Sequence, residues 1–159
     1  MDKYLIINAD DFGMCRSQNL AIYDLFEKGG ITSSTVMTPC AWGKEAAVWA
    51  KNHPEYAVGV HLTFTSEYGT YRWSPVARNN TDSLRDEEGF MYHEPAEFEL
   101  GCKLSEVEAE IRAQIERFKE FGGEPSHIDN HMGTLYGIEA GKFELLELTI
   151  KLAAEYNLP

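Results

Sequence analysis

The hydrophobic and polar positions of this chain divide it into short apolar runs and longer amphipathic stretches. The short runs are rich in aliphatic and β-branched residues, which predicts strands. Together with one more polar segment that we also interpret as a strand, they cover residues 4–7, 31–38, 57–63 and 126–131. The longer stretches carry apolar residues at helical spacing. They predict helices over residues 17–28, 43–52 and 143–155.

The clearest helix follows a long break in this rhythm. It begins with a capping-box pattern at residues 105–108, has apolar residues at helical spacing from Leu104 to Phe118, and stops before Gly122. The preceding residues 64–103 contain scattered glycines, prolines and aromatics. A loop of this length in a compact domain is usually functional or disordered, and the aromatics argue against disorder. We interpret it as a lid or a substrate-facing insertion.

Strands that alternate with helices indicate an α/β fold with a mainly parallel sheet. Functional sites in such folds gather at the carboxyl ends of the strands. Three polar clusters fall at these ends, namely the pair Asp10 and Asp11, the single His61, and residues 127–131. The clusters were not used to place the strands, so their common position favours one shared site.

Composition narrows the class of protein. The 159 residues suit one domain, and a hydrophobic content of 43% is sufficient for a core. A formal net charge of −12 disfavours nonspecific binding to nucleic acid or anionic membranes. We see no signal-peptide pattern and no apolar run near the ~18 residues of a membrane span. Three cysteines without paired spacing favour a reducing, cytoplasmic setting.

Adjacent carboxylates at the end of a buried strand need a cation or a shifted pKa to compensate them. Carboxylates combined with separate histidines are ligands that suit a divalent metal with an open position. One aspartate of the pair can bind the metal while its neighbour acts as a base. In an extended segment, His127, Asp129 and His131 share one face. Two such histidines are distant for sharing one ion, and His131, nearer the strand end, is the better ligand.

Each cluster also has a purely structural interpretation. Asp10 and Asp11 could cap the following helix, and His61 could be a hydrogen-bonded core histidine. Asp129 could accept a structural hydrogen bond or orient a ligating histidine. Residues 11–13 copy the magnesium-binding tripeptide of protein kinases, but no glycine-rich loop precedes them, so we reject that interpretation. The joint position of the clusters favours the metal site.

Three motifs resemble the YdjC-like carbohydrate deacetylases, which include chitooligosaccharide deacetylase. They are Asn-Ala-Asp-Asp-Phe-Gly at residues 8–13, Gly-Val-His-Leu-Thr at residues 59–63, and Ser-His-Ile-Asp-Asn-His at residues 126–131. The motifs keep the family's order, and the resemblance extends from Lys3 to about Gly133. Together they are specific, although each alone is weak.

The resemblance implies a distorted (β/α) barrel of the glycoside hydrolase/deacetylase type, of which only the N-terminal part is present. It implies one divalent ion, Mg²⁺ or Zn²⁺, held by Asp11, His61 and His131, with Asp10 as the catalytic base. The neighbouring His127 and Asp129 are candidates for an alternative ligand or for residues that contact a ligand. The implied reaction removes the N-acetyl group of an N-acetylated amino sugar or chitooligosaccharide by hydrolysis.

We therefore expect residues 1–159 to be a single catalytic domain that is C-terminally truncated, because four strands cannot close a barrel of about seven or eight. The long insertion at residues 64–103 lies within it. The expected partner is a small carbohydrate substrate, with no nucleic acid and no membrane; a homodimer is one candidate assembly. Two alternative functions stay open at this point: a metal-dependent hydrolase of another ester or phosphodiester bond, and a non-catalytic sugar-binding relative.

Overall fold

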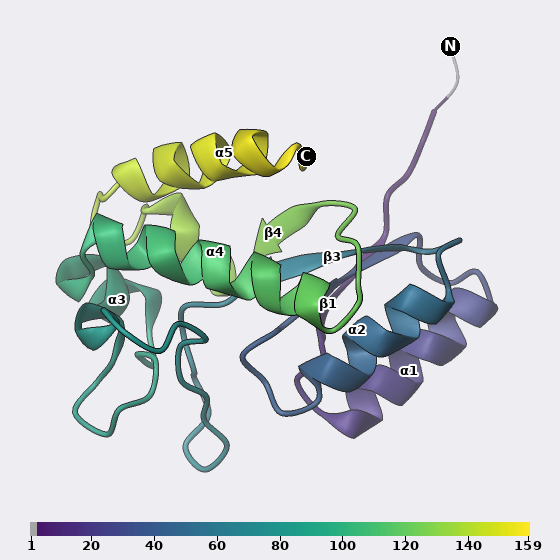
Figure 1. Ribbon diagram of the computed structural model, residues 1–159, viewed down its shortest axis with the longest axis horizontal. Helices are drawn as coiled ribbons and strands as arrows, with labels where there is room; N and C mark the ends of the chain where they lie inside the picture. Colours follow the sequence, from purple (N-terminus) through teal and green to yellow (C-terminus); the bar gives the residue numbers. More distant parts are fainter. Residues whose placement is uncertain (1–2) are drawn as a thin grey trace.

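The structure is a computed structural model that describes residues 3–159. Its centre is a parallel sheet with four strands in the order β1-β2-β3-β4 (Figure 1). The strands are β1 (Asn8–Phe12), β2 (Ser33–Val36), β3 (Ala57–Leu62) and β4 (Ile128–Asn130). Neighbours in the sheet are thus neighbours in the sequence, joined by crossovers. The expected α/β class with a parallel sheet is confirmed.

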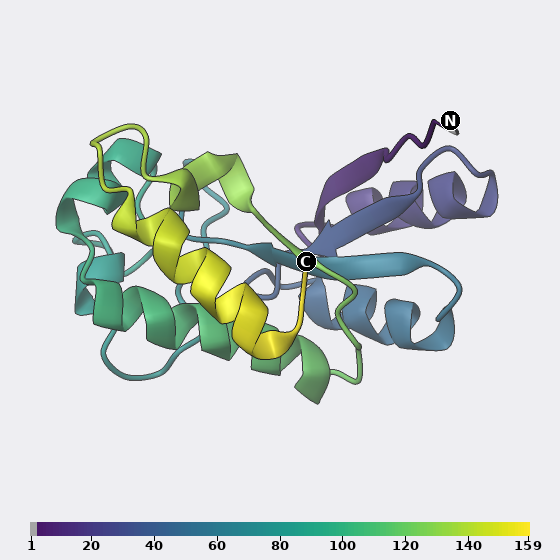
Figure 2. The ribbon, with the colours of Figure 1, turned by 90° about the horizontal axis from the view of Figure 1, so that it is seen from above.

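Five α-helices and two short 3₁₀ helices are described around this sheet. They are α1 (Arg16–Glu27), α2 (Gly43–Asn52), η1 (Asp82–Leu84), α3 (Pro95–Gly101), α4 (Leu104–Glu120), η2 (His131–Tyr136) and α5 (Glu144–Tyr156). The helices α4 and α5 run side by side in both ribbon views (Figures 1 and 2). Trp49 of α2 stacks on Tyr23 and Phe26 of α1, so these two helices also pack together.

One hydrophobic core joins the sheet to its helices. Its fully buried members from the strands and from α4 are Phe12, Val36, Val60, Leu62, Val107, Ile111, Ile115 and Phe118. Burying one such side chain contributes about 1.5–3 kcal/mol. This packing fixes the strands relative to each other, and with them the carboxyl edge of the sheet.

The first strand begins four residues later than the apolar run predicts. Residues 4–7 are the predicted buried strand, yet Tyr4, Leu5 and Ile6 are 91%, 74% and 78% exposed. The pairing of β1 starts with Asn8 opposite Ser33, so the preceding residues extend beyond the sheet. Figure 1 shows this segment leaving the body of the protein. The prediction is wrong because apolar character favours burial only where neighbouring residues supply a partner.

The two aspartates consequently lie inside β1 rather than after it. The register of β1 against β2 shifts between Ala9 and Phe12, which marks a β-bulge, and Asp11 adopts a φ of 61°. Gly13 follows with a φ of 90°, and a Cβ there would lie 2.7 Å from the Cα of Gly43. Glycine is therefore required at this position, where β1 passes close to the start of α2.

The capping box predicted at residues 105–108 does not form. The helix α4 begins at Leu104, and its N-cap Lys103 makes no side-chain cap. The prediction is wrong because the helix starts one residue before Ser105, and the carboxylate of Glu108 pairs with Arg112 at 2.7 Å. The neighbouring Glu106 accepts hydrogen bonds from the backbone N–H and the hydroxyl of Ser83, both at 2.8 Å, and so fastens η1 to the start of α4.

The insertion at residues 64–103 is ordered and contains η1 and α3. Arg72 organises its middle: the guanidinium donates to the carbonyl of Ser66 at 3.3 Å and pairs with Asp86 at 2.6 Å. Glu110 of α4 accepts the N–H groups of Val76 and Ala77, both at 2.8 Å. These buried polar contacts hold the insertion against the body of the protein.

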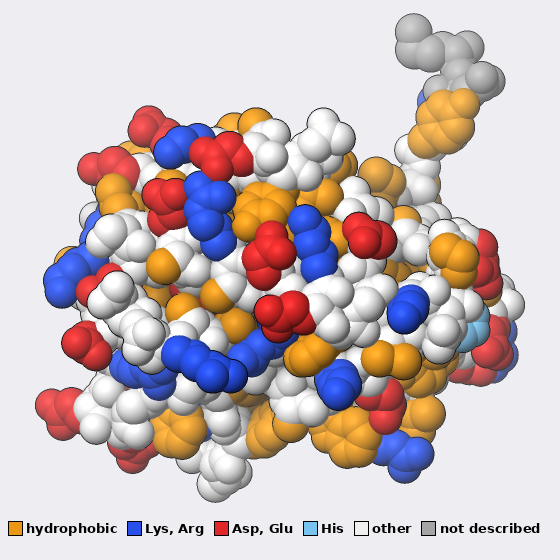
Figure 3. Space-filling view, in the orientation of Figure 1, with side chains coloured by type: hydrophobic (Ala, Val, Ile, Leu, Met, Phe, Trp, Pro, Cys, Tyr) orange, Lys and Arg blue, Asp and Glu red, His pale blue; other side chains and the backbone are white. Residues whose placement is uncertain are grey.

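The sheet is open over the part of the chain that the structure describes, with β1 and β4 as its outer strands. Figure 3 shows acidic and basic side chains interspersed over the face that carries α4. Among residues 3–159, no helix is both long and apolar enough to cross a membrane.

Candidate metal centre

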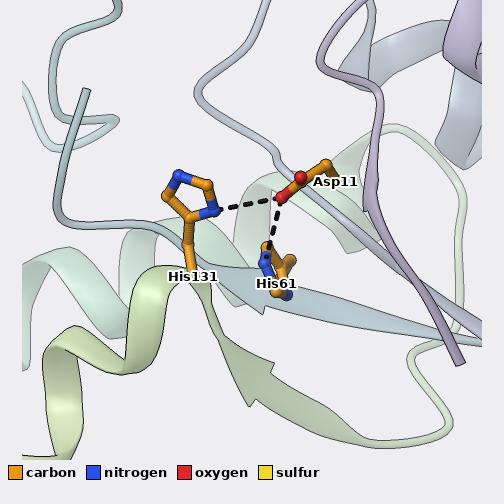
Figure 4. A group of neighbouring side chains, drawn as sticks. All are labelled: Asp11, His61 and His131. Atoms are coloured by element: carbon orange, nitrogen blue, oxygen red, sulfur yellow. Dashed lines mark hydrogen bonds and ion pairs between the residues drawn. The ribbon is translucent and has the colours of Figure 1, made fainter. Parts of the chain in front are cut away.

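One carboxylate and two imidazoles converge at the carboxyl edge of the sheet. The Oδ1 atom of Asp11 lies 3.3 Å from Nε2 of His61 and 3.0 Å from Nδ1 of His131 (Figure 4). One ligand atom from each residue lies within 4.8 Å of those of the other two. Both histidines are buried, with exposed fractions of 2% and 4%. The structure therefore brings together the three residues that the sequence suggests as ligands.

The backbone explains this convergence. His61 is the penultimate residue of β3 and pairs in register with Asp129 of β4. His131 follows the last residue of β4 and begins η2, so it sits beyond the edge rather than within a strand. The bulge in β1 places Asp11 against both histidines. Parallel strands bring their carboxyl ends to the same edge, which unites residues up to 120 positions apart.

Asp129 holds the far side of the His61 ring. Its Oδ1 atom lies 2.6 Å from Nδ1 of His61, and its Oδ2 atom accepts a hydrogen bond from the hydroxyl of Thr35 at 2.8 Å. The side-chain amide of Asn8 donates to the same Oδ2 atom at 3.3 Å. A carboxylate fixed in this way sets the tautomer and orientation of the imidazole, so that Nε2 faces Asp11.

Asp10 lies at the exposed side of the same group. One oxygen of its carboxylate accepts a hydrogen bond from the amide of Asn8 at 2.7 Å. Asp10, His61 and Asp129 also form a group whose ligand atoms lie within 4.8 Å of one another. The two neighbouring aspartates therefore differ: Asp11 contacts both histidines, while Asp10 is open to solvent beside them.

His127 lies apart from the three converging residues. It lies two residues before Asp129. Its carbonyl accepts the N–H of Val60 at 3.0 Å, and its Nδ1 shares a hydrogen bond with the hydroxyl of Ser126 at 2.9 Å. Burial lowers the pKa of His127, although the charge of Asp129 opposes this effect. The structure thus brings Asp129, but not His127, into contact with the ligand group.

Opposing effects set the protonation of the three converging residues. Burial alone would raise the pKa of Asp11, but hydrogen bonds from His131 and His61 outweigh it and hold that pKa well below its usual range. Burial alone would lower the pKa of His61, but hydrogen bonds to Asp11 and Asp129 raise it to about 9. Asp11 and Glu67 likewise outweigh burial and raise the pKa of His131. The neighbouring carboxylates thus favour the protonated form of both imidazoles when no metal is bound.

Sequence reasoning assigned no individual role to three residues that support this group. Glu67 lies 3.1 Å from Nε2 of His131, and Thr35 and Asn8 hold Asp129. The polar Thr35 in a fully buried strand is a signal that could have been used. Glu67 gives no such signal, because it is one of 26 acidic residues and lies in a segment without regular periodicity.

The residues present fit a divalent metal. Two imidazole nitrogens and one carboxylate oxygen form a donor set that suits Zn²⁺ and related ions, while Mg²⁺ prefers oxygen donors. Three protein donors leave a coordination position for a reacting molecule. The buried charges of the group also require a cation or bound protons for balance.

The fold and the site define an α/β protein with a candidate single-metal centre at the carboxyl edge of a parallel sheet. The family model for YdjC-like protein matches residues 4–159, and the chain belongs to this family. The resemblance seen in the three sequence motifs is confirmed.

Named relatives and a solved structure agree with this assignment. The chain is 38% identical over 131 residues to a carbohydrate deacetylase of Geobacillus stearothermophilus, covering 82% of this chain and 50% of the relative. It is 36% identical over 132 residues to a chitooligosaccharide deacetylase of Yersinia enterocolitica, with the same coverage of 82% and 50%. The chain spans about half the length of the curated relatives it matches.

A crystal structure from Enterococcus faecalis V583 resembles the chain in three dimensions. That protein is described provisionally as a cellobiose-phosphate cleavage protein. The TM-score is 0.82 at 35% identity, and the match covers 97% of this chain and 56% of the other. The likeness extends over nearly the whole chain.

Proposed function

We propose that this chain carries the metal centre of a carbohydrate deacetylase, which hydrolyses the N-acetyl group of an N-acetylated amino sugar or chitooligosaccharide. The observation that carries the proposal is the convergence of Asp11, His61 and His131 with Asp10 beside them. Family membership and the names of the relatives support the substrate class.

Each residue has a distinct role in this proposal. Asp11, His61 and His131 hold one divalent ion, Zn²⁺ or Mg²⁺. When bound, the ion supplies Lewis-acid chemistry, which polarises a carbonyl group and makes water more acidic. Asp10 is the general base that takes a proton from the attacking water. Its exposure to solvent and its position next to Asp11 suit that role, and Asn8 fixes one oxygen of its carboxylate.

Aromatic residues of the insertion support a sugar substrate. The ring of Trp73 lies 6.2 Å from the ring of His131, and Tyr68 and Tyr71 contact Trp73 edge-on at 6.1 and 5.8 Å. Tyr68 and Tyr71 are 44% and 38% exposed. An aromatic ring offers an apolar face with a polar tip, which matches the apolar C–H face and polar hydroxyls of a pyranose. This supports the interpretation of residues 64–103 as a substrate-facing insertion.

Location and assembly belong to the same proposal. The thiols of Cys15, Cys40 and Cys102 are free, which supports a reducing compartment such as the cytoplasm. A homodimer stays a prediction, which sedimentation of the purified protein tests directly.

The decisive experiment is an acetate-release assay on the full-length protein. The protein is stripped with a chelator, reloaded with Zn²⁺ or Mg²⁺, and incubated with diacetylchitobiose. Metal-dependent acetate release supports the proposal. Release of glucose from cellobiose phosphate, or hydrolysis of a phosphodiester or simple ester without acetamide cleavage, would contradict it. Sugar binding without turnover would indicate a non-catalytic relative instead.

A further inference from the structure

Both imidazoles of the candidate centre make two polar contacts, one with each ring nitrogen. Nε2 of His61 faces Asp11, and its Nδ1 contacts Asp129 at 2.6 Å. In His131 the ring is reversed, with Nδ1 facing Asp11 at 3.0 Å and Nε2 contacting Glu67 at 3.1 Å. Each histidine thus lies between the shared Asp11 carboxylate and a second carboxylate on its outer side.

An imidazole that binds a metal through one nitrogen carries its proton on the other. A carboxylate that accepts this proton in a hydrogen bond fixes the tautomer, holds the ring in place and makes the ligand nitrogen more basic. Asp129 is positioned to do this for His61. Glu67 occupies the equivalent place at the outer nitrogen of His131, where its side chain is only 23% exposed.

We propose that Glu67 is the positioning residue of His131, so that the insertion at residues 64–103 forms part of the metal centre. The inference rests on the proposed metal site and assigns a function to a residue beyond its three ligands. With an ion on Nδ1, the Nε2–H group of His131 donates to Glu67. The ring is then fixed from both sides, as the ring of His61 is.

The two residues directly before Glu67 are held by several hydrogen bonds. The N–H of Ser66 donates to the carbonyl of Tyr92 at 2.7 Å, and its hydroxyl accepts the N–H of Trp73 at 3.0 Å. The indole N–H of Trp73 donates to the carbonyl of Thr65 at 2.8 Å, and Arg72 donates to that of Ser66 at 3.3 Å. These bonds aim the carboxylate at His131, which argues against an accidental contact of a loose loop.

The arrangement couples the ion to the insertion. An ion bound at Nδ1 polarises the ring and strengthens the hydrogen bond from Nε2–H to Glu67. Because Glu67 directly follows Thr65 and Ser66, which are hydrogen-bonded to Trp73, ion binding stabilises the turn formed by residues 65–73. The coupling is reciprocal, so a turn held in place also raises the affinity for the ion.

The first test measures Zn²⁺ affinity by competition with a chromophoric chelator. Glu67→Ala should weaken Zn²⁺ binding about 10–100-fold, the usual effect of losing such a partner. Glu67→Gln keeps an acceptor oxygen and should retain most of the affinity. Glu67→Met fills the same space without a strong acceptor and should behave like Glu67→Ala, which covers the case in which the smaller residue impairs folding. Glu87→Ala, an exposed residue of the same segment, is the matched control and should leave the affinity unchanged.

A double-mutant cycle separates positioning from direct ligation. If Glu67 acts through His131, then Glu67→Ala should cause no further loss of Zn²⁺ affinity in a His131→Ala background. A further loss of the same size would show that Glu67 binds the ion by itself, and would overturn the proposal.

Hydrogen exchange supplies a readout that does not depend on activity. Zn²⁺ should slow amide exchange over residues 64–73 in the wild type, and should do so much less in Glu67→Ala and Glu67→Met. If the wild type binds no Zn²⁺, the proposed metal site itself fails. If the wild type and both variants bind Zn²⁺ equally, the metal site stands and the role of Glu67 is wrong.

Discussion

Asp11 depends on its backbone as much as on its charge. A φ of 61° lies in the left-handed region, which costs an L-residue about 1–2 kcal/mol, though Asp and Asn tolerate it better than most. The bulge that produces this conformation places the carboxylate between two histidines. Local strain is thereby retained at the point where the ligand group is assembled.

Substitution of Asp11 can separate its charge from its conformation. Asp11→Asn introduces a side chain that tolerates the left-handed region. Asp11→Ala introduces one that does not. Both should lower Zn²⁺ affinity by more than about 100-fold, because the loss of a metal ligand should weaken binding more than the loss of a residue that only positions a ligand. Asp11→Ala should also unfold at a lower temperature than Asp11→Asn in excess chelator. Equal midpoints for the two variants would show that the bulge is not strained.

Asp10 should affect turnover rather than metal binding. In Asp10→Asn, a general base is lost and kcat for acetate release should fall about 10²–10⁴-fold. Zn²⁺ affinity should stay near that of the wild type, because Asp10 lies outside the Asp11, His61 and His131 group. A variant that loses metal affinity and turnover in parallel would assign Asp10 to the ligands instead.

At the scale of elements, sequence reasoning succeeded where local signals set the boundaries. The helix predicted over residues 43–52 has those bounds, and the helix predicted over 17–28 is shifted by one residue. It failed for residues 4–7, where partners distant in sequence decide, and for the capping box, because α4 begins one residue before Ser105. Strand ends indicated that the three polar clusters share one site, and the family resemblance implied the ligands among them, while Glu67 reaches the site through tertiary contacts alone.

The ion pair of Arg72 and Asp86 makes the insertion sensitive to acid. Burial alone would raise the pKa of Asp86, but hydrogen bonding to Arg72 outweighs it and lowers that pKa. The folded state therefore gains stability above the unfolded pKa of 3.8, and loses it as pH falls through the lower folded value. Asp86→Asn should lower the free energy of unfolding by about 1 kcal/mol at pH 7, and the difference should shrink as the pH falls below 3.8.

Denaturant unfolding of the wild type and Asp86→Asn at several pH values measures this difference. Glu87→Gln, next in the chain and exposed, is the control for a lost negative charge. A difference that persists unchanged at low pH would mean that Asp86 acts through its shape rather than its charge.

Tyr68 should contribute to sugar binding through its ring. Tyr68→Ala removes the exposed ring beside Trp73, and an aromatic contact of about 0.5–1.5 kcal/mol corresponds to a KM increase of roughly 2–10-fold. Tyr68→Phe keeps the ring and should retain a near-normal KM, and kcat should change little in both variants. The assay is acetate release at varied diacetylchitobiose. A loss confined to kcat would contradict a role in binding.

At the scale of the whole molecule, the described chain exposes surfaces that favour association. The outer strand β1 leaves one edge unpaired over residues 3–159, and Leu5 and Ile6 are largely exposed beside it. On the outer side of β4, the N–H of Ile128 donates to the carbonyl of Pro159 at 3.1 Å. Unpaired edges and exposed apolar residues are templates for contact between chains. This 159-residue chain should therefore self-associate as its concentration rises.

A charge placed on this surface tests the explanation. Ile6→Lys should reduce the concentration-dependent association seen by sedimentation velocity. Leu100→Lys alters an equally exposed apolar residue on α3 and should not. Equal effects of both substitutions would point to general solubility rather than to this edge of the sheet.

The ligands of the candidate centre come from β1, β3 and the residue after β4, so Asp11 and His131 are 120 positions apart. An unfolded chain cannot hold them together, and an ion that binds the native state alone shifts the folding equilibrium. At a concentration 100 times its Kd, such an ion adds about 2.7 kcal/mol to stability. Degradation in cells follows the unfolded fraction. The supply of the ion would then govern how long each folded molecule survives, in addition to whether it can react.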